Sequence, residues 1–420
     1  MSAENRKTEN RKTSMQQIVI EKPYEFVAPH RGNWWPNIIQ RFRLIDRWLR
    51  KSHGITSYEC LGVEKLRASL AAGHGIMLTP NHCRPSDPIV MGFPAREANT
   101  HVYAMASWHL YNQDRFTAFA IPKMGGFSVN REGIDRKSLN TAIEILETAE
   151  RPLIVFPEGA TTRLNDRLLD FLDGVSFVAC TSAKRRAKRV VGGKVVVHPV
   201  AIKYFFLGDL RAATEPLLSE IERRLTWKVD SEHSLVERIG HIGDALLSLK
   251  ELEYLGAAQC GTISERCHRL IDVLLSPIEE DWLGTDEREK GVVPRVKALR
   301  MAIVPELTRN EVSEAERTRR WNQLADIYLA QQLSCYPEGY LQPPTSADRI
   351  LETVERLKED LTDAVTPHPP TQVVVQIGDP IEVETTRDRK SATDPLMARI
   401  REEIQAMLDE LAKRSPIYDE

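Results

Sequence analysis

GIMLTPNHCRPSD, residues 75–87, joins an apolar run to a histidine and an aspartate. The apolar part, residues 75–79, has the length and composition of a buried β-strand. His82 and Asp87 are five positions apart, which in an unbroken helix is about 140° of rotation, so their side chains would not meet. Pro85 breaks such a helix, and a bend there would fold the aspartate back to the imidazole. The stretch therefore predicts a strand, a bent loop, and a helix capped by Asp87.

From about residue 56 to 206, short apolar runs alternate with helical patterns. Strands are predicted at residues 75–79, 101–106, 152–156 and 194–204, and helices at 87–98, 109–120, 137–149 and 170–189. This alternation is typical of an α/β fold in which a mixed, mostly parallel sheet is flanked by helices. We expect such a core over residues 54–206.

Residues 207–370 have a different character, because helical periods dominate and strand patterns vanish. The stretch QVVVQIGDPIEVE at 372–384 then reads as a strand, and a helix is predicted over 391–413. The simplest interpretation is a large helical insertion before the last strand, with residues 371–415 closing the core. Two consecutive domains are the alternative, and they would leave the late strand without an obvious sheet.

The N-terminal part of the chain divides at residue 33. Residues 1–32 begin with a polar segment in which ENRKT occurs twice in tandem, which predicts a disordered tail without a secretory signal. Residues 33–53, GNWWPNIIQRFRLIDRWLRKS, predict one amphipathic helix with tryptophans on one face and arginines on the other. Such a helix suits a membrane interface, and it equally suits docking on the protein's own core. The residues alone leave both interpretations open.

The bulk composition is that of an ordinary globular protein. The 420 residues carry a formal net charge of -3, which gives no argument for nucleic acid as a partner, and none is expected. No apolar run reaches the roughly 18 residues of a membrane span. The 6 cysteines lie far apart without a C-x-x-C pair, so we expect reduced cytosolic thiols and no metal site.

The loop GGFSVNREGIDR, residues 125–136, combines glycines with an arginine. Gly126 would let the backbone approach a ligand closely, and the guanidinium of Arg131 matches the geometry of phosphate. When the loop is taken alone, a hairpin or turn with a solvated arginine explains the same residues better.

The stretch LIVFPEGATTR, residues 153–163, ends a strand in a polar cluster. Pro157 and Gly159 terminate the strand and hold Glu158 at its tip, where backbone N–H groups could face an anion. Thr161 and Arg163 add a hydroxyl and a guanidinium within one turn. A capped loop is the alternative interpretation.

Pro199, in VHPVAIKY, interrupts a strand-like run. A proline there predicts an edge or an irregular wall. Its apolar neighbours would line an acyl-chain groove or belong to the core.

Taken together and in this order, these stretches resemble the glycerolipid acyltransferase superfamily, the 1-acylglycerol-3-phosphate (lysophosphatidic acid) acyltransferases and their relatives. The first motif, N-H-x-x-x-x-D, is matched by Asn81, His82 and Asp87, and the second by Gly126, Phe127 and Arg131. The third, F-P-E-G, is matched by Phe156, Pro157, Glu158 and Gly159, with Arg163 downstream, and the fourth by Pro199.

The resemblance implies an O-acyltransferase of phospholipid biosynthesis. His82 would deprotonate the hydroxyl of a lysophospholipid such as 1-acylglycerol 3-phosphate, and Asp87 would orient His82 and balance its charge. The acyl group would come from acyl-CoA or acyl carrier protein as co-substrate, with no bound cofactor. The resemblance assigns acceptor and phosphate binding to Arg131, Glu158, Gly159, Thr161 and Arg163, and the wall of the acyl pocket to Gly126, Phe127, Pro157 and Pro199. It also favours a cytoplasmic protein held on the cytoplasmic face of a membrane by residues 33–53.

Other functions remain open from the sequence. The acceptor could instead be a lyso-ornithine lipid, glycerol 3-phosphate, or a phospholipid in remodelling. A non-catalytic binding protein with this fold would use the helical insertion as a surface for a protein partner. A hydrolase would use the same histidine and aspartate to activate water.

Overall fold

The computed structural model describes residues 22–225, 228, 232–284, 290–309, 311–362, 365–385 and 394–419. At the centre of this part of the chain is a mixed sheet with the strand order β1-β7-β6-β2-β5-β3-β4, and β8 also pairs with β6. The strands are β1 (Ile55–Leu61), β2 (Gly75–Pro80), β3 (Tyr103–Ser107), β4 (Gly126–Val129), β5 (Leu153–Ile154), β6 (Val195–Phe206), β7 (Thr371–Ile377) and β8 (Ile381–Glu382).

Five neighbouring strands, β6, β2, β5, β3 and β4, run parallel to one another. Strands β7 and β8 are antiparallel to β6, and β1 is parallel to β7. The prediction of a mixed, mostly parallel sheet is therefore confirmed. Because parallel strands end at the same edge, the loops after β2, β5, β3 and β4 are brought together there, where open α/β sheets bind their ligands.

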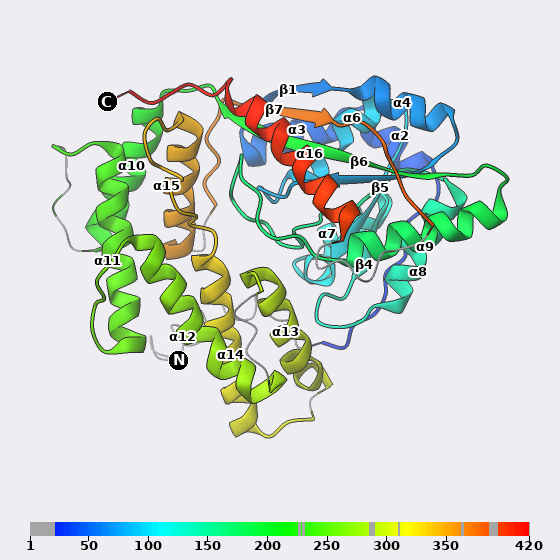
Figure 1. The fold of residues 1–420 in the computed structure, drawn as a ribbon. Coiled ribbons are helices and arrows are strands. Elements are labelled where there is room, and N and C mark those ends of the chain that lie inside the picture. Colours follow the sequence, from blue (N-terminus) through cyan, green and yellow to red (C-terminus); the bar gives the residue numbers. More distant parts are fainter. Residues whose placement is uncertain are drawn as a thin grey trace.

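Helices cover both faces of the sheet (Figure 1). They are α2 (Trp34–Arg41), α3 (Leu44–His53), α4 (Val63–Ala71), α5 (Asp87–Val90), α6 (Gly92–Glu97), a 3₁₀ turn η1 (Trp108–Asn112), α7 (Arg115–Lys123), α8 (Arg136–Thr148), α9 (Gly174–Arg189) and α16 (Pro395–Ala412). Residues of α8, α9 and α16 pack on one face, and residues of α3, α4, α5 and α6 contribute to the core on the other. Strand β6 is buried throughout. Its sequence is therefore mostly apolar on both faces of the sheet and does not alternate between apolar and polar residues.

Six helices lie between β6 and β7 in the described part of the chain. They are α10 (Leu210–Arg224), α11 (Leu235–Leu255), α12 (Ile263–Leu283), α13 (Val292–Arg309), α14 (Glu314–Leu333) and α15 (Ala347–Thr362). They have hydrophobic clusters of their own and form a lobe beside the sheet (Figure 1). Strand β7 then enters the sheet between β1 and β6. The expected fold class, with a large helical insertion before the chain rejoins the sheet, is confirmed.

Buried arginines join successive helices of the insertion in a repeated way. The fourth residue of α11, α12 and α13 is an arginine whose Nε lies 2.8–2.9 Å from a glutamate on the preceding helix. The pairs are Arg238 with Glu222, Arg266 with Glu251, and Arg295 with Glu279. Arg320 of α14 contacts Glu306 of α13 in the same sense, although Glu306 is half exposed. These contacts fix each helix against the one before it.

The N-terminal region differs from its prediction. The single helix expected over residues 33–53 is two helices, because Arg43 adopts a left-handed conformation with φ of 49° between α2 and α3. The end of the expected disordered tail is also ordered: the Val27 N–H donates to Ser128 Oγ at 2.8 Å. Residues 1–21 lie outside the described part. Among the described residues, no helix combines the length and hydropathy needed to cross a bilayer.

Several further elements differ from the sequence interpretation. Strands β1 and β4 were not predicted, and the strand expected over 372–384 is divided into β7 and β8. The helix expected over 109–120 begins as a 3₁₀ turn, and α7 starts only after Asp114, whose carboxylate accepts a hydrogen bond from the Thr117 N–H. The helix expected over 87–98 is two short helices, α5 and α6.

Candidate active site

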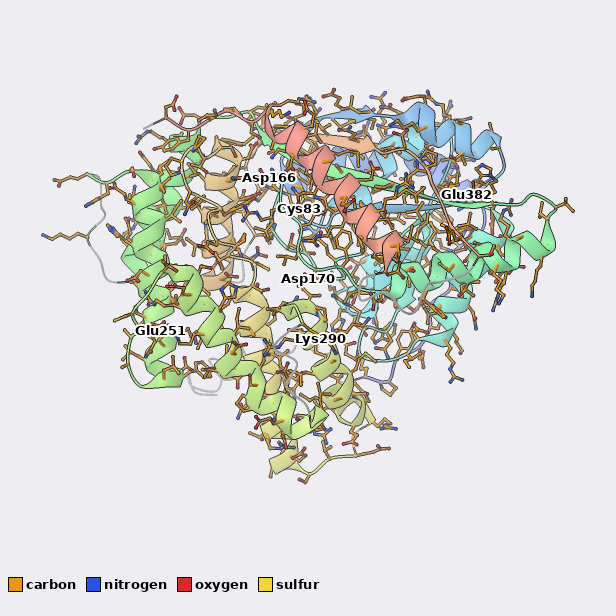
Figure 2. All side chains as sticks on the ribbon, viewed as in Figure 1. Cys83, Asp166, Asp170, Glu251, Lys290 and Glu382 are labelled. Carbon is orange, nitrogen blue, oxygen red and sulfur yellow. The ribbon has the colours of Figure 1, made fainter. Side chains whose placement is uncertain are left out.

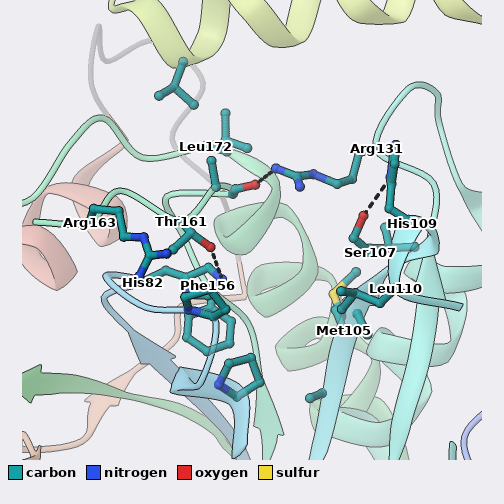
Figure 3. A pocket seen from close by; sticks show the side chains of 18 of the residues that line it. His82, Met105, Ser107, His109, Leu110, Arg131, Phe156, Thr161, Arg163 and Leu172 are labelled. Carbon is teal, nitrogen blue, oxygen red and sulfur yellow. Dashed lines mark hydrogen bonds between the residues drawn. The ribbon is translucent and has the colours of Figure 1, made fainter. Parts of the chain in front are cut away.

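A cavity of about 1820 Å³ lies at the carboxyl edge of the parallel strands. Its walls come from the loops after β2, β3, β4 and β5, from helices α2, α3 and α7, and from α11 to α15 of the insertion. Figure 3 shows His82 and Thr161 on one side of it and Ser107 and His109 on the other. Arg131 extends between them towards the loop that carries Thr161 (Figure 3).

His82 and Asp87 are in direct contact, because the loop after β2 bends back as its proline predicts. His82 Nδ1 lies 2.9 Å from Asp87 Oδ2, and the carboxylate is fully buried whereas 16% of the histidine side chain is exposed. A carboxylate accepts hydrogen bonds, so Nδ1 carries the proton and Nε2 is left with its lone pair. Nε2 lies 3.2 Å from Thr161 Oγ1, and His82 lines the cavity. The unprotonated nitrogen is thus held where a substrate hydroxyl can reach it.

Asp87 is itself held by groups from two elements. The Tyr204 hydroxyl of β6 donates to Oδ1 at 2.6 Å, and the Arg84 N–H donates to Oδ2 at 2.8 Å. Tyr204 is almost fully buried, and its hydroxyl also lies 3.0 Å from Ser86 Oγ. The sequence analysis did not identify Tyr204; its only signal is a hydroxyl-bearing residue late in a long apolar strand.

Asn81 does not line the cavity, although it begins the first motif. Its amide donates to the Ile202 carbonyl at 3.0 Å and accepts from the Ile202 N–H at 2.7 Å. It therefore continues the pairing of β2 with β6 beyond the end of β2. This fixes the point at which the chain leaves the sheet for His82.

Glu158 is placed by the structure in the protein interior and not on the cavity wall. Its carboxylate accepts from the His82 N–H at 2.8 Å and from the Leu169 N–H at 3.1 Å. Burial raises the pKa of Glu158 to about 7, against the lowering effect of these two N–H groups. Direct contact with an acceptor was expected of Glu158; its carboxylate instead braces the backbone of the loop that carries His82.

Gly159 forms the tight turn after β5. It has φ of 66°, and a Cβ there would overlap Leu172. Its N–H donates to the Phe156 carbonyl at 3.2 Å, so that N–H is used within the turn rather than offered to an anion. Its carbonyl accepts from Arg131 Nη2, which ties the second motif to the third.

Arg163, Pro157 and Gly126 also line the cavity. Arg163 Nη2 lies 2.5 Å from Glu359 Oε2 of α15, so its charge is shared with the insertion. Phe127 and Pro199, the other two residues expected on the acyl wall, are placed elsewhere. Phe127 is fully buried in the hydrophobic core, and Pro199 is buried within β6, because both belong to strands with two covered faces.

Apolar side chains from the N-terminal helix α2, from the sheet and α7, and from the insertion also line the cavity. They include Ile38 and Trp35 of α2, Phe119 of α7, Met105 of β3, Val296 of α13 and Leu333 of α14. His82 is therefore flanked by surface suited to hydrocarbon.

The fold and the site define an α/β protein with a histidine on the wall of a largely apolar cavity and a buried aspartate paired with it. Residues 58–203 match the family model described as Acyltransferase. The chain thus carries an acyltransferase domain of the glycerolipid acyltransferase family, and the resemblance seen in its motifs is confirmed over this range. Such a domain implies acyl donor and acceptor substrates and a role in lipid metabolism. A search of curated proteins gave no match.

Proposed function

We propose that the protein transfers a fatty acyl group from acyl-CoA or acyl carrier protein to the hydroxyl of a lysophospholipid such as 1-acylglycerol 3-phosphate, in phospholipid biosynthesis. The observation that carries the proposal is the contact of 2.9 Å between His82 Nδ1 and the buried carboxylate of Asp87. It leaves Nε2 as a base facing an apolar cavity.

The reaction needs no covalent enzyme intermediate. His82 Nε2 removes the proton of the acceptor hydroxyl as its oxygen attacks the thioester carbonyl. The new C–O bond forms, the C–S bond breaks, and the thiolate that leaves takes the proton back from His82. Asp87 stabilises the imidazolium while it exists. The hydroxyl of Thr161, 3.2 Å from Nε2, stands where the acceptor hydroxyl would be bound.

The size of the cavity supports an acceptor that already carries an acyl chain. Its volume of about 1820 Å³ exceeds the roughly 300–1,000 Å³ of ordinary small-molecule sites. Glycerol 3-phosphate would fill a small part of it, whereas a lysophospholipid and an acyl donor together would use both its polar centre and its apolar walls. The guanidinium of Arg131 supports a phosphate on the acceptor.

The test is acyl transfer from a labelled acyl thioester to a panel of acceptors, run with His82→Ala and Asp87→Asn. We expect transfer to a phosphorylated lysolipid, and a loss of about 10²–10⁴-fold in kcat for His82→Ala. His74→Ala is the matched control, because His74 precedes the opposite end of β2 and lies outside the cavity lining. Use of unphosphorylated acceptors alone would refute the acceptor class, release of free fatty acid alone would indicate a hydrolase, and no turnover would favour a binding protein.

The proposal includes a location on the cytoplasmic face of a membrane, reached through residues 33–53. Trp34 and Trp48 are 63% and 45% exposed, and exposed arginines lie on the same two helices. Phe116 and Phe119 of α7 are also exposed and line the same cavity. Aromatic and cationic side chains together favour an interface with anionic lipid.

Co-sedimentation with anionic liposomes tests this location. The double variant Trp34→Ser/Trp48→Ser should reduce the bound fraction, whereas Leu249→Ser/Leu252→Ser, at exposed leucines of α11, should not. Substitution is a sharper test than deletion of residues 33–53. Deletion would remove Leu49, which is buried in the hydrophobic core, and would therefore destabilise the fold as well as remove the exposed aromatic side chains. Equal binding of all three proteins would exclude α2 and α3 as the anchor.

A further inference from the structure

Helix α13 of the insertion brings two cations to the cavity that contains Arg131. Lys297 and Arg300 line that cavity together with Arg131 of the loop after β4. The helix is fixed there by the Arg300 Nη2 contact with Glu132 Oε1, at 2.6 Å. The backbone at Gly291 also approaches Asp170 so closely that a Cβ would overlap its carboxylate. Asp170 lies on the side of the core that faces the insertion (Figure 2).

Positive charges outnumber negative ones where Arg131, Lys297 and Arg300 line the cavity beside Glu132. Desolvation, and then the nearby Arg300, lower the pKa of the Arg131 guanidinium, although the Arg131 side chain remains partly exposed. Partial desolvation also lowers the pKa of Lys297, which is exposed; Asp173 opposes this effect and Arg131 adds to it. Glu132 is engaged by Arg300 and lies 3.7 Å from His109 Nε2. Like charges that are brought together on the wall of one cavity repel one another, and a bound anion relieves that repulsion.

We propose that Lys297 and Arg300 of the insertion act with Arg131 to bind the phosphate of a substrate. This inference deepens the proposed function and rests on it. Arg131 supplies a planar fork and Lys297 a point charge, which together suit a phosphoryl group rather than a planar carboxylate. The family match ends at residue 203, so these two residues lie outside the matched domain. Phosphate is carried by the lysophospholipid acceptor and also by CoA and the phosphopantetheine of acyl carrier protein, and the experiment separates these sources.

The variant to test is Lys297→Met, because removing Arg300 would leave the buried Glu132 without its partner. We expect the KM of the phosphate-bearing substrate to rise about 10- to 100-fold, as for a lost charge-assisted hydrogen bond. Lys297→Arg, which keeps the positive charge, should restore a KM close to that of the wild type. Lys250→Met is the control, since Lys250 also lines the cavity from the insertion but pairs with Glu253 on its own helix.

Paired substrates distinguish the source of the phosphate. An effect on 1-acylglycerol 3-phosphate, absent with monoacylglycerol, assigns the site to the acceptor. An effect on acyl-CoA, absent with the phosphate-free N-acetylcysteamine thioester, assigns it to the donor. KM values within twofold of the wild type for all four substrates would overturn the inference and leave the proposed acyl transfer intact.

Binding of inorganic phosphate, measured by calorimetry, provides a readout that needs no turnover. We expect Lys297→Met to weaken this binding about tenfold or more relative to the wild type and to Lys250→Met. If the protein transfers no acyl group but its phosphate affinity depends on Lys297, the proposed function fails and the phosphate site stands. Equal affinity of the three proteins for phosphate would overturn the site.

Discussion

Asp87 is the most constrained group of the candidate site, since His82, Arg84 and Tyr204 all hydrogen-bond its carboxylate. The contact with His82 could be predicted from the sequence, because a proline within a five-residue separation dictates a bend. Tyr204 could not, because it lies 117 residues further along the chain and reaches Asp87 only through the pairing of β6 with β2. Residue-scale predictions therefore succeeded where the partners are local and failed where the sheet brings them together.

Removing the Tyr204 hydroxyl should impair turnover without weakening substrate binding. In Tyr204→Phe the buried Asp87 carboxylate loses a hydrogen bond of 2.6 Å, and we expect kcat to fall about tenfold. KM should stay within a factor of about two. Tyr103→Phe is a matched control, because the Tyr103 hydroxyl also donates to a carboxylate at 2.6 Å, that of Glu150, away from the cavity. Equal effects of the two substitutions on kcat would show that Tyr204 only supports the fold.

Glu158 should make stability depend on pH. Its pKa in the folded protein is about 7, against an ordinary 4.5, so between these values the folded state keeps a proton that the unfolded chain has lost. The stabilisation is complete below pH 4.5 and is lost as pH rises through 7, a change on the order of 3 kcal/mol.

Urea unfolding at pH 5 and pH 8 checks this prediction. Glu158→Gln should reduce the loss of stability between the two pH values. Glu352→Gln is a useful second variant, because burial raises the pKa of Glu352 to about 8. The stability that protonated Glu352 contributes should therefore be lost at a higher pH than the contribution of Glu158. If the wild type and Glu158→Gln lose the same stability, the carboxylate titrates normally and the prediction is wrong.

Among the helices and strands, the bounds were predicted best for strands that follow long apolar runs. Strands β2, β3 and β6 follow such runs, whereas β5 is only Leu153–Ile154, because the chain turns at once into the loop that carries Glu158. Strand β1 was missed because most of its residues are only partly buried and its pattern is weak. The break between α2 and α3 has no local signal either: Arg43 is neither glycine nor proline, although its φ is positive.

The turn at Gly159 should tolerate no side chain. Gly159→Ala must keep φ of 66°, which costs about 1–2 kcal/mol for an L-residue, and its Cβ would also displace Leu172. Because the Gly159 carbonyl holds Arg131, we expect lower activity as well as a lower Tm. Gly192→Ala is the matched control, since φ is 71° there and no atom lies within 4 Å of the added Cβ. A Tm loss no larger than that of the control would mean that the loop adjusts.

At the scale of the whole molecule, the insertion completes the site rather than standing apart from it. Arg84 pairs with Glu355 at 3.3 Å, Arg163 with Glu359, and Asp166 (Figure 2) with Arg349 at 3.1 Å. The position of the insertion could be predicted from the sequence, but its role as a cavity wall could not. Each of these pairs joins residues far apart in the chain, and no local pattern encodes them.

The buried pairs between insertion helices should show strong non-additivity. Arg238→Met alone removes the arginine that pairs with the buried Glu222 and should cost about 3–5 kcal/mol, whereas Arg238→Met/Glu222→Met should recover most of that loss. Arg211→Met, which breaks an exposed pair on α10, should change stability by less than about 1 kcal/mol. Unfolding free energies of the wild type, the single variants Arg238→Met and Glu222→Met, their double variant and Arg211→Met measure this, and additive losses in the pair would contradict it.

The recurring arginine–glutamate contact gives the insertion the character of a modular array. Each of these arginines joins its helix to the one before it, whereas α13 and α15 are also joined to the core, by Arg300 with Glu132 and by Arg349 with Asp166. Loosening one joint, as in Arg266→Met, would therefore alter helices that line the cavity while the strands of the sheet keep their pairing. The preference for acyl-chain length should broaden in a competition assay of this variant, and an unchanged chain-length profile would contradict that consequence.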